Sequence, residues 1–241
     1  MADMKLQKVA NDCLKKLDFS QPILSETYFY NSVPLAVIDA VYSLGIRYAT
    51  TKKVVASFCE RAGIVRLREY GSAPIDTKDQ FAISDFIQLV KLIGLDTITS
   101  DFFRSKNRTS TTNGILKSEA VLNFCKILQL HGIEYLQDLQ KLFSNGEMQA
   151  NLIALERALR SVKGQKSGIS TSYFFMLCGD GYSIKPDRMV LRFLKESTSQ
   201  NVFVHEAKGV LSQVLEILKK TYPVLTLREL DHAIWKYESA R

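Results

Sequence analysis

Between residues 158 and 194 the chain holds glycines, lysines, serines and one aspartate at spacings that suggest chemistry. Gly164 and Gly168 interrupt an otherwise helical pattern and predict a tight turn between two helices. Backbone N–H groups at the start of the second helix would then point outward among cations and hydroxyl groups, which suits a bound phosphate. The candidate phosphate-binding residues are Gly164, Gln165, Lys166, Ser167, Gly168 and Ser170.

The aspartate of this stretch, Asp187, directly follows Pro186 and precedes a helical pattern that begins at Arg188. We expect Asp187 at or near the helix N-cap, where the backbone holds it in place. A fixed carboxylate can stabilise a positive charge that develops during a reaction, and can also orient or deprotonate an attacking water. The alternative interpretation is a helix cap without a chemical role.

These features resemble the helix-hairpin-helix plus Gly/Pro-Asp element of the DNA glycosylase superfamily that includes endonuclease III, the adenine glycosylases and the 3-methyladenine glycosylases. In this likeness the hairpin is residues 162–170, the loop is residues 178–186 and the essential acid is Asp187. The strings SGISTSYFFMLCG and KPDRMVLRFL carry it. Upstream, GILKSEAVLNFCKIL resembles the helix that precedes the hairpin in endonuclease III.

The resemblance implies an enzyme that binds double-stranded DNA, flips out a modified base and hydrolyses its N-glycosidic bond with help from Asp187. Bifunctional members carry a lysine nucleophile, and its place here falls near Gly168 or Ile169. Neither can attack, so the resemblance implies a monofunctional enzyme that leaves an abasic site. Two roles stay open: base excision repair, and defence against phage DNA with bases such as glucosylated hydroxymethylcytosine. The rival hypothesis is a non-catalytic helix-hairpin-helix module that binds DNA.

Alternating strand patterns are nearly absent, so the sequence predicts an all-α fold. The resemblance implies two helical lobes with a cleft between them. Residues 31–184 would form the central lobe, and residues 1–30 with 185–241 the second lobe. The expected helices cover residues 4–17, 33–44, 54–62, 79–93, 117–131, 135–143, 148–161, 171–178, 188–196, 204–220 and 226–237.

The sequence gives weaker signals for the residues that would contact the flipped base or fill the gap that it leaves in the duplex. The turn after the first central helix offers Ile46, Arg47 and Tyr48 as a wedge that fills the gap. A flipped base could stack on aromatic side chains, and the basic loop 104–110 could contact phosphates or a bulky base substituent. The alternatives are core packing for the apolar side chains and a solvated loop. The candidates for the base pocket and loop contacts are Tyr28, Tyr30, Tyr42, Asn107 and Arg108.

The composition of the chain limits which partners, metals and cellular locations are expected. The 241 residues carry a net charge of +7, which mildly favours a polyanionic partner. Four scattered cysteines form no CxxC pair, so nothing supports a metal site or the iron–sulfur cluster of endonuclease III. No cofactor is expected, a nucleotide cofactor included. The absence of a long apolar run and of an N-terminal signal pattern favours a cytoplasmic monomer with no membrane contact.

Overall fold

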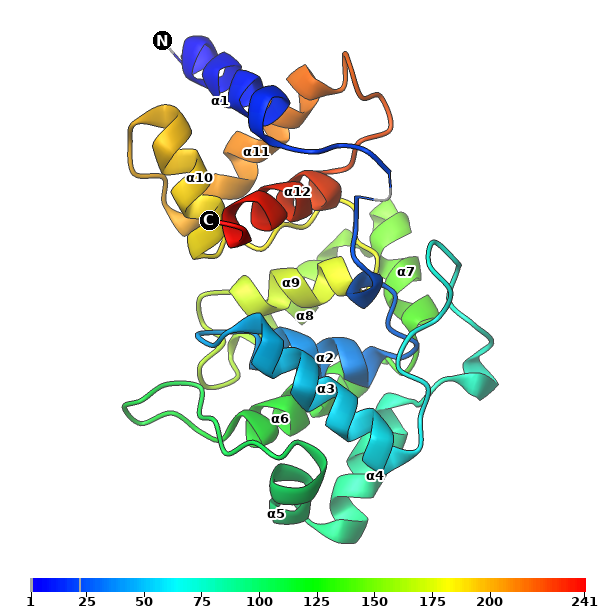
Figure 1. The fold of residues 1–241 in the computed structure, drawn as a ribbon. Coiled ribbons are helices and arrows are strands. Elements are labelled where there is room, and N and C mark those ends of the chain that lie inside the picture. The colour runs from blue at the N-terminus through cyan, green and yellow to red at the C-terminus, as the bar shows by residue number, and fades with distance from the viewer. Residues whose placement is uncertain (1, 22) are drawn as a thin grey trace. The chain divides into compact units, whose positions relative to one another are not determined.

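The computed structural model describes residues 2–21 and 23–241, and the regular elements of this part are all helical (Figure 1). Two isolated β-bridges, Tyr30–Leu67 and Arg108–Leu116, are the extended pairings that accompany them. The predicted all-α class is therefore confirmed. The α-helices are α1 (Ala2–Lys16), α2 (Val33–Tyr42), α3 (Tyr48–Ala62), α4 (Ile83–Ile93), α5 (Leu95–Thr97), α6 (Lys117–Leu130), α7 (Leu136–Ser144), α8 (Gln149–Arg160), α9 (Ile169–Leu177), α10 (Arg188–Thr198), α11 (Val204–Leu218) and α12 (Leu227–Ser239).

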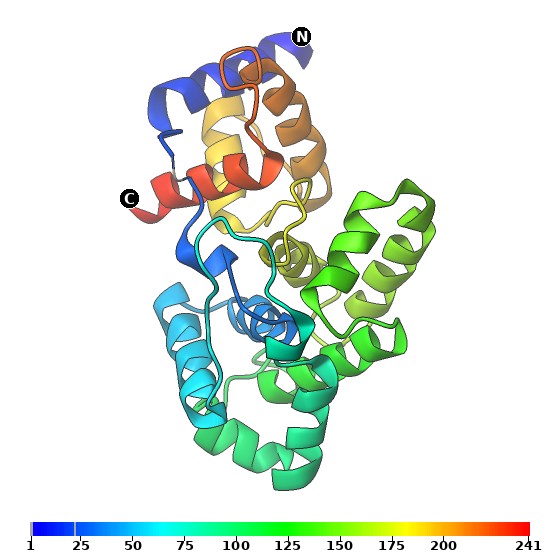
Figure 2. The same ribbon diagram turned by 90° about the vertical axis from the view of Figure 1, so that its right-hand side faces the viewer.

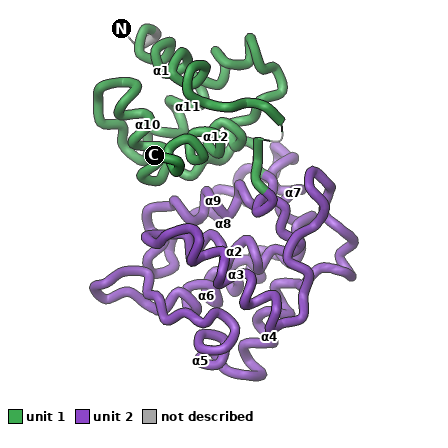
Figure 3. Tube along the Cα trace, viewed as in Figure 1, with its two compact units in different colours: residues 1–25, 180–241 green, residues 26–179 purple. Residues whose placement is uncertain are grey.

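The chain folds into two compact units, each with its own core (Figure 3). Unit 1 comprises residues 1–25 and 180–241, and unit 2 comprises residues 26–179. Both ends of the chain thus contribute to one unit. The boundaries expected from the sequence, at 30/31 and 184/185, each lie five residues further along the chain.

Unit 2 is built around α2, whose ten residues are all buried. The run VPLAVIDAVY has no polar face, so α2 can be stable only when other helices cover every side of it. It contacts α3, α6 and α9, and α9 is itself almost wholly buried. Aromatic rings fill the space between α6 and α9, where the Phe124 and Phe174 ring centroids lie 5.2 Å apart. The loops that leave these helices are therefore held on a rigid base.

Unit 1 consists of α1, α10, α11 and α12 around one apolar core, and Figure 2 shows it from a second side. α10 is strongly amphipathic, and Val190, Phe193 and Leu194 on its apolar side lie in the core. α1 adds Val9 and Cys13 to the same core. α1 therefore packs with α10 and α11, although the whole of unit 2 lies between them in the sequence.

Two helix starts differ from the sequence-based expectation by four residues or more. α3 begins at Tyr48 instead of residue 54, because Thr51 packs inward and the first turn follows directly from the preceding loop. α4 begins at Ile83 instead of residue 79, because Thr77–Asp79 forms a separate 3-10 turn, η2, and Ala82 is extended. In the irregular stretch 99–113 the first residues belong to a π-helix, η3 (Ile98–Phe102).

Candidate functional site

The turn between α8 and α9, residues 161–168, has the backbone that its glycines predict. Gly164 and Gly168 have φ angles of +90° and +78°, in the left-handed region that favours glycine. Gly168 is the N-cap of α9 and brings no side chain to cap it; the Ile169 N–H lies 3.5 Å from the Ser167 hydroxyl. Lys166 is exposed, and its carbonyl accepts hydrogen bonds from the Arg160 guanidinium at 3.2 and 3.3 Å.

Two of the candidate phosphate-binding side chains point inward instead. Gln165 and Ser170 are 1% and 0% exposed, and the Ser170 hydroxyl donates to Gln165 Oε1. The prediction that these two side chains contact phosphate is therefore corrected: they bind each other beneath the turn. Lys163, Lys166 and Ser167 stay exposed on its outer side.

The basic loop between η3 and α6 packs directly against this turn. A Cβ built on Gly164 would overlap the Thr109 side chain, lying 2.6 Å from its Oγ1 atom. Thr109 is fixed in turn by the Ile115 amide and carbonyl, because its amide donates to Ile115 O at 2.9 Å and its hydroxyl accepts from Ile115 N at 3.2 Å. Gly164 is thus the position at which the loop and the turn touch, a contact that the sequence alone did not reveal.

Lys117 joins the same loop to the turn between α2 and α3. Its amide donates to Asn107 O at 2.8 Å, and its buried ammonium donates to Tyr42 O at 2.9 Å and Leu44 O at 2.6 Å. The lysine therefore caps the C-terminus of α2 and sets the position of residues 43–47. In Figure 1 the α2–α3 turn, the 103–116 loop and the α8–α9 turn all come to the left side of unit 2.

These three segments form one basic face, which we call the basic face of unit 2. Residues 43–47, 104–114 and 161–168 contain no acidic residue. Their six cations are exposed, and none makes an ion pair with a described residue. The loop alternates, with its cations outward and Ser105, Asn107 and Thr109 half-buried. The six cations are Arg47, Arg104, Lys106, Arg108, Lys163 and Lys166.

Of the candidate wedge residues, Tyr48 holds the backbone in place, and Ile46 and Arg47 stay at least partly exposed. Tyr48 is half-buried, and its hydroxyl donates to Asp39 Oδ2 at 3.1 Å, so it holds the start of α3. Arg47 is exposed and Ile46 is half-buried at the turn before it. Of the three, Ile46 and Arg47 are the residues that the structure leaves available for an outside partner.

The candidate base-pocket tyrosines lie in the packed interior of unit 2. Tyr28, Tyr30 and Tyr42 are 4%, 1% and 0% exposed, so stacking on a flipped base would require a rearrangement. Tyr30 donates to Asp39 Oδ2 at 2.8 Å, beside the bond from Tyr48. Burial, and then the Asp39 charge, raise the pKa of Tyr30 and Tyr48 well above the ordinary range. A buried carboxylate held by phenols was signalled in the sequence by the one acid within the apolar run of α2.

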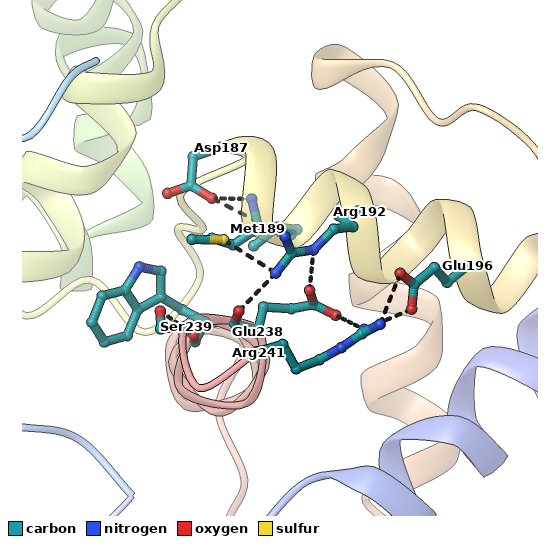
Figure 4. A network of polar contacts seen from close by, with 9 residues as sticks. Asp187, Met189, Arg192, Glu196, Glu238, Ser239 and Arg241 are labelled. Carbon is teal, nitrogen blue, oxygen red and sulfur yellow. Dashed lines mark hydrogen bonds and ion pairs between the residues drawn. The ribbon is translucent and has the colours of Figure 1, made fainter. Parts of the chain in front are cut away.

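Asp187 is the N-cap of α10, as the sequence predicted. Its Oδ1 atom accepts hydrogen bonds from the amides of Met189 at 2.8 Å and Val190 at 3.4 Å (Figure 4). The side chain is half-buried, and its Oδ2 atom has no hydrogen-bond partner among the described residues. The carboxylate is therefore fixed by one oxygen while the other stays available.

A second aspartate supports the loop that carries Asp187. Asp231 on α12 is 2% exposed, and its Oδ1 atom accepts the Lys185 amide at 2.9 Å, two residues before Asp187. Burial raises the pKa of Asp231 well above its ordinary value, the Lys185 amide opposes this, and the nearby Asp187 charge adds to it. The residue lies in the run LDHAIW, where its apolar neighbours could have marked it as buried.

An ion-pair network ties α10 to α12 next to Asp187. Arg192 donates to the Glu238 carboxylate and, at 2.6 Å, to the Glu238 carbonyl (Figure 4). Arg241 joins Glu196 at 2.7 Å and Glu238 at 3.2 Å. Glu238 is fully buried, so its charge is stabilised only while both arginines stay in place. The network fixes the helix that Asp187 caps.

Among the described residues, we also looked at the cysteines, at possible metal ligands and at possible membrane spans. All four cysteines are buried and free, and burial raises the pKa of Cys13 to about 12. No cluster of three or more His, Cys, Asp or Glu side chains with metal-binding geometry occurs in residues 2–21 and 23–241. Within the same ranges, no helix has the length and apolar character that a membrane span requires.

The fold and these sites describe an all-helical protein with a basic face on one unit and a helix-capping carboxylate on the other. A family model described as a domain of unknown function (DUF8548) matches residues 7–239, nearly the whole chain. The chain therefore belongs to this family. No protein of curated function and no solved structure matches it.

Proposed function

We propose that the protein is a monofunctional DNA N-glycosylase that excises a modified base with the assistance of Asp187. The observation that carries the proposal is the state of this carboxylate: Oδ1 is held by two backbone amides and Oδ2 is left without a partner. A pre-positioned negative charge of this kind stabilises a developing oxocarbenium ion without having to reorganise during the reaction. The half-buried setting strengthens that interaction relative to bulk water.

The basic face of unit 2 supports DNA as the partner. Six exposed cations on three segments, with no acid among those segments, favour contacts to a row of phosphates. Thr109 against Gly164 and Lys117 against the α2–α3 turn fix the three segments relative to one another. A pre-formed face loses little conformational entropy when it binds.

Chemistry without a lysine nucleophile is part of the proposal. The only lysines in the 161–168 turn are Lys163 and Lys166, and the carbonyl of Lys166 is tied to Arg160. We assign these lysines to phosphate contacts and assign water as the nucleophile. The C–N bond breaks with its electron pair leaving on the base, while water forms a new C–O bond at the anomeric carbon and gives up a proton, and the base takes up a proton. An abasic site remains, and Asp187 stabilises the sugar cation on the way.

Incubation with end-labelled duplexes tests this function. One panel carries alkylated, oxidised and deaminated bases, and a second is phage genomic DNA with glucosylated hydroxymethylcytosine. Each reaction is read before and after alkali, and breaks that appear only after alkali support the proposal and identify the substrate. Breaks without alkali would show a lysine nucleophile. DNA that is bound but never broken would favour the non-catalytic DNA-binding module.

A further inference from the structure

A pocket with a volume of about 640 Å³ opens between α3 and residues 103–107, entirely within unit 2. Two of its lining residues, Arg104 and Lys106, also belong to the basic face of unit 2, whereas the excision chemistry at Asp187 does not involve the pocket. Its volume falls within the range of about 300–1,000 Å³ that is typical of small-ligand sites. Eight of its eleven lining residues are polar or charged, and the other three are Val54, Ala56 and Phe103. The pocket is therefore large enough for one nucleotide-sized group.

The charges at its rim favour an anion. Lys53 comes from α3, and Arg104 and Lys106 come from the loop, against the single acid Glu60. None of these four makes an ion pair with a described residue. Three unpaired cations around one concave surface repel one another, and a phosphate among them would relieve that repulsion.

Neutral polar groups inside the pocket complete a nucleotide-like pattern. The Ser57 hydroxyl oxygen is shielded from solvent and has no hydrogen-bond partner in the described part of the chain. Ser105 and Asn107, both half-buried, also line the pocket. A shielded hydroxyl without a partner costs free energy unless a ligand bonds to it. Sugar hydroxyls, phosphate oxygens and base edges all supply such partners.

Arg104, at the rim of the pocket, has a strained backbone conformation. Its φ angle is +48°, a left-handed conformation that costs a residue with a side chain about 1–3 kcal/mol. Hydrogen bonds on both sides impose it: Phe103 N donates to Ile98 O at 2.9 Å, and Ser105 N donates to Thr99 O at 3.1 Å. Glycine would fit this backbone without strain, so the arginine side chain is present despite its cost.

We infer that this pocket binds a phosphate-bearing nucleotide unit, with Lys53, Arg104 and Lys106 around the phosphate and Ser57 beneath it. The inference rests on the proposed function where it takes the DNA strand as the source of that unit. The loop that forms one wall of the pocket also reaches Gly164 through Thr109, so a strand along the loop would meet both places. A free mononucleotide presents the same chemistry and is the second source to test.

Arg104→Gly is the most informative variant, because it removes the guanidinium and relieves the backbone strain together. Lys106→Glu reverses a second rim charge on the exposed side of the loop. Lys91→Glu, on the exposed face of α4 outside the pocket, is the matched control for net charge. Thermal unfolding of each full-length variant separates loss of binding from loss of fold.

Binding is measured by fluorescence anisotropy with a labelled 20-base-pair duplex across a salt series, and by calorimetry with thymidine 5′-monophosphate. We expect Arg104→Gly to unfold at an equal or higher temperature while its duplex affinity falls about tenfold and its salt slope decreases by about one. Lys91→Glu should bind as the unmodified protein does. Competition by the mononucleotide would identify a free nucleotide as the ligand and also supports the inference.

Lys166→Glu distinguishes failure of the inference from failure of the proposed function. If Lys166→Glu weakens duplex binding while both pocket variants bind normally, and the mononucleotide gives no heat, the inference is overturned and the proposed function stands. If the unmodified protein binds no duplex, the proposed function fails. The mononucleotide titration then decides the inference alone, and absence of heat overturns it.

Discussion

The Thr109 side chain occupies the space directly over the Gly164 α carbon, so the basic loop and the α8–α9 turn interlock at one point. This contact requires glycine at position 164 for two separate reasons. The φ angle of Gly164 is +90°, and a methyl group there would lie 2.6 Å from Thr109 Oγ1. A residue that looks like a simple turn glycine in the sequence is therefore also a packing contact between two basic segments.

Gly164→Ala should lower the free energy of unfolding by about 1–3 kcal/mol, from backbone strain and overlap with Thr109. Chemical denaturation of both proteins measures the difference. Gly209→Ala in α11 is the matched control, because the added methyl meets nothing within 4 Å. The control should gain about 0.5–1 kcal/mol. A Gly164→Ala protein as stable as the unmodified one would contradict the interlock.

Lys117→Met should loosen the α2–α3 turn. The methionine keeps the apolar body of the side chain but leaves the Tyr42 and Leu44 carbonyls without the ammonium, which costs about 1–3 kcal/mol. We also expect faster proteolysis within residues 43–47 and weaker duplex binding. Lys126→Met, at an exposed position on the same helix, should change none of these. Equal proteolysis rates for the two variants would count against this role of Lys117.

Asp231 should matter as a hydrogen-bond acceptor more than as a charge. Asp231→Asn keeps an acceptor for the Lys185 amide, whereas Asp231→Ala removes it and should cost about 1–3 kcal/mol. Because burial raises the folded-state pKa of Asp231, its contribution is lost as pH rises from the unfolded value of 3.8 through that pKa. The Asn variant should therefore equal or exceed the unmodified protein in stability at pH 7. A large loss for Asn in denaturant titrations would refute this.

His232 should make stability decrease under mild acid. It stacks on Trp235 with ring centroids 5.6 Å apart, and burial lowers its pKa to about 4. Between the unfolded value of 6.5 and about 4, the unfolded chain takes up a proton that the folded chain does not. The free energy of unfolding should therefore decrease as the pH is lowered from 6.5 to about 4, by at most about 3 kcal/mol. Subtracting the His232→Gln curve removes the other titrating groups, Asp231 included, and a zero difference would contradict the burial effect.

Periodicity was enough to predict the helical class, most helix positions and the N-cap place of Asp187, because each depends on neighbours along the chain. Helix starts at Tyr48 and Ile83 were misjudged because packing of Thr51 and a short 3-10 turn override local preference. Inward side chains in a polar turn, such as Gln165 and Ser170, could not be recognised because their burial depends on the tertiary fold.

Long-range contacts explain what sequence analysis missed in the candidate site. Thr109 against Gly164, and Lys117 against the α2–α3 turn, join segments that lie far apart in the chain and share no pattern. Asp39 and Asp231 did carry a signal, because a single acid within an apolar helix must find partners when it is buried. Its partners, such as Tyr30 and the Lys185 amide, became visible only in the structure.

Asp187→Asn gives the most direct test of the central claim, because asparagine caps helices about as well as aspartate but carries no charge. Single-turnover excision on the substrate found in the duplex panels should fall at least about a hundredfold, with unchanged unfolding temperature and duplex affinity. Asp187→Ala should lose the same activity and, in addition, about 1 kcal/mol of stability from the missing cap. Full excision activity in Asp187→Asn would contradict the claim that this carboxylate takes part in the chemistry.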